Sequence, residues 1–419
     1  MTPPDDDVEH HRRRGWLQRS LFAALLIAAA CMRVDDTRTV TLFSNDEANY
    51  ARLTDIVLTQ GSAGLQAEAA RFRAQPSPFD GPSPMRAGYL YAMAGLMRVT
   101  GWQGIRAIAL GSALLDAVSL GLVGVLAWTR MGPGRALAAM LLYSVSPPVL
   151  AMARRAWQEP LVVCLGLLVM LTGLKCVETR GRGWAVTMGA LAGFTFTIKE
   201  TAFIEACLLV VLAGVALARQ REWTTLSWLG ASFLVALGAA WLWLGQLLGG
   251  VAQVMYFLTA NVRIAAQTPY AVKYQSGTAM DWLTMVWRGD PFLTLLAGLG
   301  VVAATAAWRL GRQPGRLVVW SIAIAAMFLV LPVLSANRLN LRFAGPALAA
   351  MCWLGAEALF AGDRLLRRSL TPRGATIAPL SMAIYLGVIA VAGVAQFRTT
   401  FEARAMVDLS SGLVLARDP

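Results

Sequence analysis

Residues 16–32, WLQRSLFAALLIAAACM, decide the fold class of this chain. They are almost entirely apolar, and a helix that crosses a bilayer needs about 20 such residues. Arginines crowd the segment before them, which is typical of the cytoplasmic flank of a membrane helix. The residues at the far end, Cys31-Met32-Arg33-Val34, make a poor signal-peptide cleavage site. We therefore predict a retained membrane anchor whose N-terminus lies in the cytoplasm.

Two adjacent carboxylates, Asp46 and Glu47, follow this helix within residues 44–53, SNDEANYARL. Carboxylates placed just outside a membrane helix and leading into an amphipathic segment suit an acid–base site at the bilayer surface. The structural alternative is a solvated loop that begins with charged residues. The rest of the chain favours the functional interpretation.

The composition is that of an integral membrane protein. Of the 419 residues, 57% are hydrophobic and 15% are charged, whereas a soluble domain has about 45–50% apolar and about 25% charged residues. The net charge of +13 comes mainly from arginines in the short loops between apolar runs. There they indicate topology and contact with membrane lipids, so we expect no nucleic-acid partner. Both histidines, His10 and His11, precede the first apolar run, which excludes histidine triads from the hydrophobic body.

Apolar runs separated by arginine-rich breaks predict an all-α polytopic membrane protein with about eleven transmembrane helices. With the N-terminus inside, the arginine-rich turns all fall on the cytoplasmic side, provided that the short apolar piece 87–99 does not cross. That piece is too short for a span, and we predict an interfacial or re-entrant helix. The predicted spans are 16–32, 104–128, 136–153, 160–177, 184–199, 201–218, 226–248, 291–308, 317–334, 343–361 and 375–396.

This layout predicts a cytoplasmic tail over 1–15, a transmembrane domain over 16–396 and a short external tail over 397–419. Two long external loops, 33–103 and 249–290, interrupt the transmembrane domain. Polar clusters converge on the external side, whereas the cytoplasmic side has only short basic turns, so we expect the chemistry outside. The clusters are Asp46-Glu47, Arg154-Arg155 with Glu159, Lys199-Glu200, the loop 249–290, and Arg338 with Arg342.

Four segments resemble the GT-C glycosyltransferases, in the branch that holds the protein O-mannosyltransferases and the lipid A aminoarabinose transferases. The resemblance is spread over roughly the first half of the chain and one late helix. It implies a GT-C fold and transfer of a sugar from a polyprenyl-phosphate donor to an acceptor outside the cytoplasmic membrane. The segments are 45–51 (NDEANYA), 146–160 (SPPVLAMARRAWQEP), 191–202 (LAGFTFTIKETA) and 340–348 (NLRFAGPAL).

Asp46 and Glu47 are the catalytic candidates. The resemblance assigns Asp46 to the first-loop aspartate of the family, which contacts the acceptor and is the candidate general base. An acceptor hydroxyl must lose its proton as it attacks the anomeric carbon, and a nearby carboxylate can take it. We expect Glu47 to orient the acceptor or to bond to Arg52 or another local donor. The acceptor-facing candidates are Tyr50, which shares a helix face with Glu47, together with Tyr270 and Arg338.

Cations at the membrane surface can stabilise the negative charge that develops on a leaving polyprenyl phosphate. Lys199 ends an apolar run on the external side, where topology gives its charge no role. The structural alternative is an ion pair with Glu200 or Glu205. The aminoarabinose transferases carry a Lys-Pro before the first-loop apolar helix, and Arg86 is its nearest counterpart here. The phosphate-binding candidates are Lys199, Arg342, Arg154, Arg155 and Arg86.

Glu159 lies where the family often has a second acidic residue, and it could contact the acceptor or a metal. Its place before Pro160 also suits the first turn of a helix, where the macrodipole favours negative charge. A divalent metal held by Asp46 and Glu159, as in oligosaccharyltransferases, is one alternative, although the sequence offers no dedicated ligand set. No other cofactor is expected.

These residues predict a multi-pass enzyme of the bacterial cytoplasmic membrane that works on the outer face. We expect an inverting transfer, with Asp46 as base, from a polyprenyl-phosphate sugar to a glycan, lipid or protein acceptor. The alternative is a transporter or flippase for lipid-linked glycans. A transporter should carry ionisable residues near mid-span, and the acid that meets this condition is Asp116.

Overall fold

The computed structural model describes residues 5–35, 45–75, 85–267, 277–334, 340–369 and 377–402. Within these ranges the regular secondary structure is entirely helical. The predicted all-α fold class is therefore confirmed. Of the candidate site residues, Tyr270 and Arg338 lie outside the described ranges.

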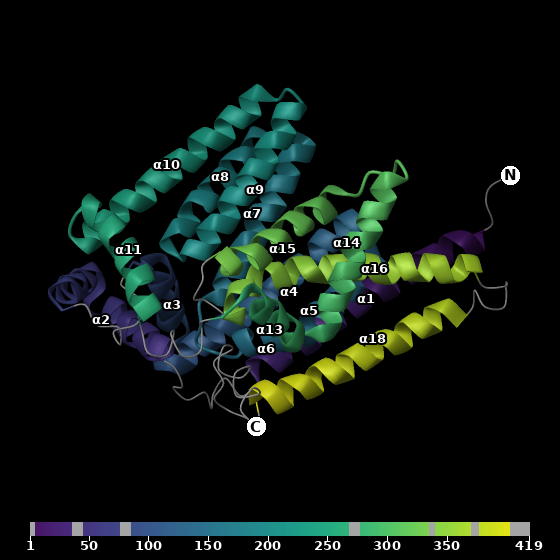
Figure 1. Ribbon diagram of the computed structural model, residues 1–419, viewed down its shortest axis with the longest axis horizontal. Helices are drawn as coiled ribbons and strands as arrows, with labels where there is room; N and C mark the ends of the chain where they lie inside the picture. Colours follow the sequence, from purple (N-terminus) through teal and green to yellow (C-terminus); the bar gives the residue numbers. More distant parts are fainter. Residues whose placement is uncertain are drawn as a thin grey trace.

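The helices of the first half of the chain fall into two groups (Figure 1). Helices α2 and α3 lie at the left of the view, and α10 runs from their neighbourhood to the top of it. The elements are α1 (Asp5–Val34), α2 (Asn45–Ala74), α3 (Ala87–Thr100), α4 (Gly104–Met131), α5 (Pro133–Val145), α6 (Pro147–Ala153), α7 (Glu159–Thr179), α8 (Arg182–Phe194), η1 (Thr195–Thr197), α9 (Glu200–Arg219) and α10 (Trp223–Leu248).

The second half adds helices that pack against α5 and against one another. In Figure 1, α16 and α18 extend in the same general direction as α1, away from α2 and α3. The elements are α11 (Val251–Gln267), α13 (Ala279–Gly289), α14 (Pro291–Arg309), α15 (Arg316–Leu334), η2 (Leu341–Ala344), α16 (Gly345–Ser369), α18 (Ile377–Gln396) and the π-helical turn η3 (Phe397–Glu402).

Each predicted span coincides with a helix or a pair of helices in this order. Among the described residues, 8 helices are long and apolar enough to cross a membrane, or up to 9 if the bent pair α5–α6 is one span. The described apolar parts of α8 and α15 fall short of that length, so the number of crossings stays a prediction.

The predicted span 136–153 is wrong in one respect, because the helix breaks at Ser146 and its two parts are bent by 65°. Pro147 and Pro148 explain the break. A proline removes a backbone donor and forces the residue before it out of the helical conformation, and Ser146 accordingly has an extended backbone (φ −62°, ψ 118°).

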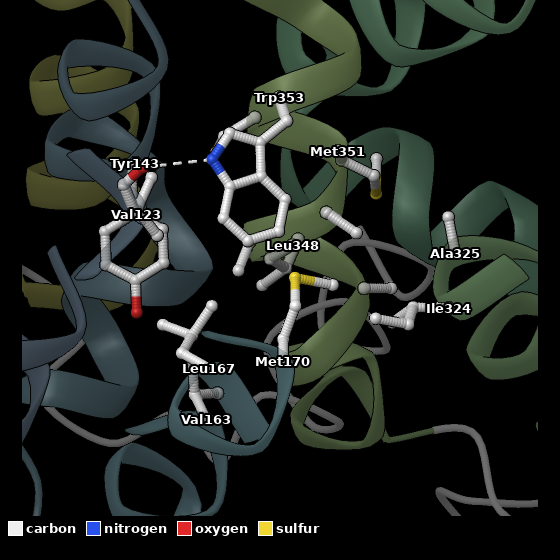
Figure 2. Packing of buried hydrophobic residues seen from close by; sticks show 14 of the residues in the cluster. Val123, Tyr143, Val163, Leu167, Met170, Ile324, Ala325, Leu348, Met351 and Trp353 are labelled. Atoms are coloured by element: carbon white, nitrogen blue, oxygen red, sulfur yellow. Dashed lines mark hydrogen bonds between the residues drawn. The ribbon is translucent and has the colours of Figure 1, made fainter. Parts of the chain in front are cut away.

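The principal core lies between the long helices and is built from apolar side chains. Figure 2 shows part of it, where Trp353 of α16 packs beside Leu348, Met170 and Tyr143. The indole nitrogen of Trp353 donates to the backbone oxygen of Val123 at 3.1 Å, so the one polar atom of this side chain is satisfied inside the core.

A second apolar cluster holds α2 and α3 against α4, α7 and the end of α10. Tyr50 and Tyr89 meet edge to face in it, with ring centroids 5.0 Å apart. Helix α2 bends at Gly61 (φ 63°), and its second half is tied to α10 by Arg73, which donates to the Leu248 oxygen at 2.7 Å. The segment after the first membrane helix is thus a packed helical layer and fixes the start of α2 in place.

Arg33 and Asp116 form an ion pair inside the bundle. Arg33 of α1 is fully buried and donates to Asp116 of α4 at 2.5 Å, and Tyr143 of α5 donates to the same carboxylate at 2.6 Å. A lone charge at this depth would be costly, and the pair removes most of that cost. The mid-span acid that a transporter would use is therefore neutralised by its neighbours.

Several arginines of the predicted cytoplasmic turns form ion pairs. Arg180 lies 3.0 Å from Glu222, Arg135 lies 2.8 Å from Glu357, and Arg130 pairs with Glu178. The side of the membrane that these turns face stays a prediction.

Candidate active site

The site begins at the first turn of α2, where Asp46 pairs with Arg342. The Asp46 Oδ2 atom accepts a hydrogen bond from Arg342 at 3.0 Å. A carboxylate in the first turn of a helix is favoured by the macrodipole, and Arg342 is fixed because Asn340 caps its backbone amide at 3.1 Å. The Asp46 side chain is 34% exposed and that of Arg342 is 12% exposed. Asp46 is therefore the carboxylate of the acidic pair that a ligand can reach.

Glu47 points the other way and is fully buried. It forms a two-pronged ion pair with Arg155, whose Nε lies 2.7 Å from Oε1, and it also accepts from the Ala156 amide at 3.3 Å. A bond to Arg52 is not its main contact, because Arg52 pairs with Glu68 at 2.7 Å. The environment of Glu47 is that of a structural carboxylate.

Lys199 and Glu159 form the third pair, at 2.6 Å, and both side chains are almost completely buried. Glu159 opens α7 ahead of Pro160, and Lys199 precedes α9 in an extended conformation. The Lys199 ammonium also lies 5.5 Å from the centre of the Phe343 ring. The suggested alternative pairing of Lys199 with Glu200 or Glu205 is wrong in this structure, since its partner is Glu159.

Arg86 closes the site from the side of α3. It donates to the Tyr50 hydroxyl at 2.5 Å and to Glu200 at 3.3 Å. Burial raises the pKa of Tyr50 above its ordinary value, so the phenol keeps its proton. Gln158, with its amide oxygen turned toward these donors, accepts from Arg86 at 2.7 Å and from Lys199 at 3.2 Å. The amide thus joins the third and fourth acid–base pairs.

Arg154 is oriented differently from the other cations, since its guanidinium lies 5.3 Å from the centre of the Phe397 ring at the C-terminal helix turn. Sequence reasoning missed Trp157 and Gln158 as members of the site, and it named Glu200 only within an external polar cluster and as a possible partner of Lys199. All three lie inside the segments that carry the family resemblance, and that position was the signal available.

Four acid–cation pairs from separate parts of the chain therefore meet at one end of the bundle. This donor set does not fit a divalent metal. Asp46 and Glu159 are each held by a side-chain cation, and Arg342 and Lys199 would face a dication directly. Among the described residues no group of three or more metal-ligating side chains is found.

Comparison with known proteins places part of the chain in a known family and the whole fold among solved structures. Residues 83–244 match the family described as dolichyl-phosphate-mannose-protein mannosyltransferase. No curated protein sequence matches the chain significantly.

Solved structures with the same fold include ArnT from Cupriavidus metallidurans bound to undecaprenyl phosphate. It is 18% identical, with a TM-score of 0.53 over 96% of this chain and 75% of that one. The Archaeoglobus fulgidus oligosaccharyltransferase is 15% identical, with a TM-score of 0.58 over 91% of this chain and 56% of that one. The same archaeal protein has been solved with an inhibitory peptide and a dolichol phosphate, at 14% identity and a TM-score of 0.57 over 94% of this chain and 56% of that one. The chain therefore has the GT-C fold of these membrane glycosyltransferases.

Proposed function

We propose that the chain transfers a sugar from a polyprenyl-phosphate carrier to an acceptor hydroxyl on the outer face of the cytoplasmic membrane. The observation that carries this proposal is the junction of Asp46, Arg342, Glu159 and Lys199, at helix ends that the positive-inside pattern predicts to face outward. The similar ArnT and oligosaccharyltransferase structures hold undecaprenyl phosphate and dolichol phosphate, respectively, which supports a lipid phosphate as carrier.

Asp46 is the proposed general base. The acceptor oxygen gives its proton to the carboxylate while it forms a bond to the anomeric carbon. The bond from that carbon to the phosphate oxygen breaks, and the electron pair leaves with the polyprenyl phosphate. A single displacement of this kind inverts the configuration at the anomeric carbon. The partial exposure of Asp46 fits this role. Glu47 is buried, which suits a residue that holds the start of α2 in place.

The cations of the site are proposed to hold the leaving phosphate. Lys199 and Arg86 converge on Gln158, and Arg342 contacts the base itself. Fixed donors that face developing negative charge lower the barrier without reorganising during the reaction. Because Arg342 touches Asp46, the base and the phosphate site would be aligned by one side chain.

The transporter alternative lacks support from the interior of the bundle. Its required mid-span charge, Asp116, is bonded to Arg33 and Tyr143. A carboxylate that already has a cation and a phenol as partners is poorly suited to alternate between states during transport.

The deciding experiment uses the purified full-length chain in lipid nanodiscs with polyprenyl-phosphate sugars labelled in the sugar. Donors are screened singly against glycan, lipid A-type and peptide acceptors. We expect one donor class to yield labelled acceptor and an equal amount of free polyprenyl phosphate, with inverted anomeric configuration by NMR. Movement of the intact donor across the bilayer with no release of lipid phosphate would contradict the proposal and favour the flippase.

A further inference from the structure

Trp157 lies under two guanidinium groups of the site. Its side chain is buried in the short segment between α6 and α7, at 2% exposure. The Arg342 guanidinium carbon lies 4.8 Å from the centre of its ring, and that of Arg155 lies 5.7 Å away. Tryptophan is the strongest aromatic partner for a cation, and both distances are within the range of this interaction.

The two arginines hold the two neighbouring carboxylates of α2. Arg342 donates to Asp46 at 3.0 Å, and Arg155 donates to Glu47 at 2.7 Å. One indole therefore contacts both cations that bind the acidic pair. It links η2, which carries Arg342, to α2, which carries the base, although 296 positions separate Arg342 from Asp46.

The backbone around Trp157 is fixed from both sides. Its carbonyl accepts from the Ser112 hydroxyl of α4 at 2.8 Å, and the neighbouring Ala156 amide donates to Glu47 at 3.3 Å. The ring is thus held against the core of the bundle. A flat, rigid surface beneath a long arginine side chain limits the conformations that the guanidinium can adopt.

We propose that Trp157 is a positioning residue that holds Arg342 and Arg155 by stacking and so sets the geometry of Asp46 before substrate binds. Its influence on sugar transfer rests on the function proposed above, whereas its effect on Arg342 does not. Trp157 acts through the two arginines and takes no part in proton transfer.

The test uses Trp157→Leu, which removes the aromatic face, and Trp157→Phe, which keeps one. In sugar transfer we expect Trp157→Leu to lower kcat about tenfold or more with a smaller change in the KM for donor, and Trp157→Phe to recover most of the loss. In a double-mutant cycle, adding Trp157→Leu to Arg342→Ala should lower kcat little further, because the two side chains act as one unit. Additive losses, or a Phe variant as slow as the Leu variant, would overturn the proposal.

A second readout needs no turnover. Phenylglyoxal modification of Arg342, followed by mass spectrometry of the intact protein and its peptides, should be several-fold faster in Trp157→Leu than in the unaltered protein, and near normal in Trp157→Phe. Trp353→Leu, which removes a buried indole from the principal core, is the control for a general loss of stability and should leave Arg342 reactivity unchanged. Equal reactivity in the two Trp157 variants would contradict the positioning role even if the chain transferred no sugar.

Discussion

The Asp46 carboxylate and the Arg342 guanidinium are joined across 3.0 Å, one from the first turn of α2 and the other from the turn before α16. The pair places a partly exposed carboxylate at the rim of a cation-rich site. An ion pair of this kind orients the carboxylate, while its second oxygen can face a ligand.

Asp46→Asn is expected to abolish sugar transfer. The amide keeps the size of the side chain and can still contact Arg342, but it cannot accept the acceptor proton, and loss of a general base costs about 10²–10⁴ in rate. Initial rates with saturating donor, measured beside thermal unfolding in detergent, check this. Retained folding with near-normal transfer would exclude Asp46 as the base.

Glu47→Gln should mainly lower the stability of the folded protein. Glu47 is fully buried against Arg155, and removal of one charge from a buried pair costs about 3–5 kcal/mol. We expect a clear fall in melting temperature that Asp46→Asn does not show. Comparison of the two variants distinguishes a residue that stabilises the fold from one that takes part in the reaction. An unchanged melting temperature for Glu47→Gln would show that Glu47 does not stabilise the fold.

Lys199→Ala should weaken use of the lipid donor more than use of the acceptor. A charge-assisted hydrogen bond is worth about 1.5–3 kcal/mol, so the KM for donor should rise roughly tenfold to a hundredfold. Lys175→Ala, near the C-terminal end of α7, is the matched control and should have no effect. Equal changes in the donor and acceptor constants would make Lys199 a structural cation.

Removal of divalent metals should leave the rate unchanged. Asp46 and Glu159 are occupied by Arg342 and Lys199, and these cations supply the positive charge that a metal would bring. Transfer is measured after dialysis against EDTA, and again with Mg²⁺, Mn²⁺ or Zn²⁺ restored. Loss of activity that returns with one metal would show that the ion pairs open to ligate it.

Cysteine labelling tests which end of the bundle faces outward. In a variant that lacks the native cysteines, Gln75→Cys after α2 should react with an impermeant maleimide in intact cells, and Gly181→Cys before α8 should react only after lysis. The positive-inside pattern motivates this expectation. The reverse pattern of labelling would invert the topology and place the site in the cytoplasm.

The sequence predicted the membrane class and most members of the site, but not their pairing. Asp46, Lys199 and Arg342 could be expected together because helix parity places them at one end of the bundle. The partner of each charge depends on how α2, α7 and η2 pack, and no local pattern encodes that. Thus Glu47 selects Arg155, more than a hundred positions away, over nearby Arg52.

The stacking of Trp157 could not be predicted from hydrophobic periodicity, for the same reason. The sequence shows Trp157 only as one residue of a motif. Its stacking depends on two arginines, and the position of Arg342 beside it follows from the folding of a distant segment. The bend at Ser146 could have been found from Pro147 and Pro148, because paired prolines interrupt a helix whatever surrounds them. Local rules therefore sufficed for the break in the helix and failed for the contacts between distant segments.

The bond between Arg33 and Asp116 has a consequence for how the chain is made. Arg33 leaves the ribosome 83 residues before its partner, so the first helix enters the bilayer with an unneutralised cation. An isolated arginine near the end of a membrane helix can reach toward the lipid headgroups. Its buried position becomes favourable only when α4 and α5 pack against α1. Packing of α1 against α4 therefore has to wait until Asp116 has been made, so an early step of assembly is coupled to a later part of the chain.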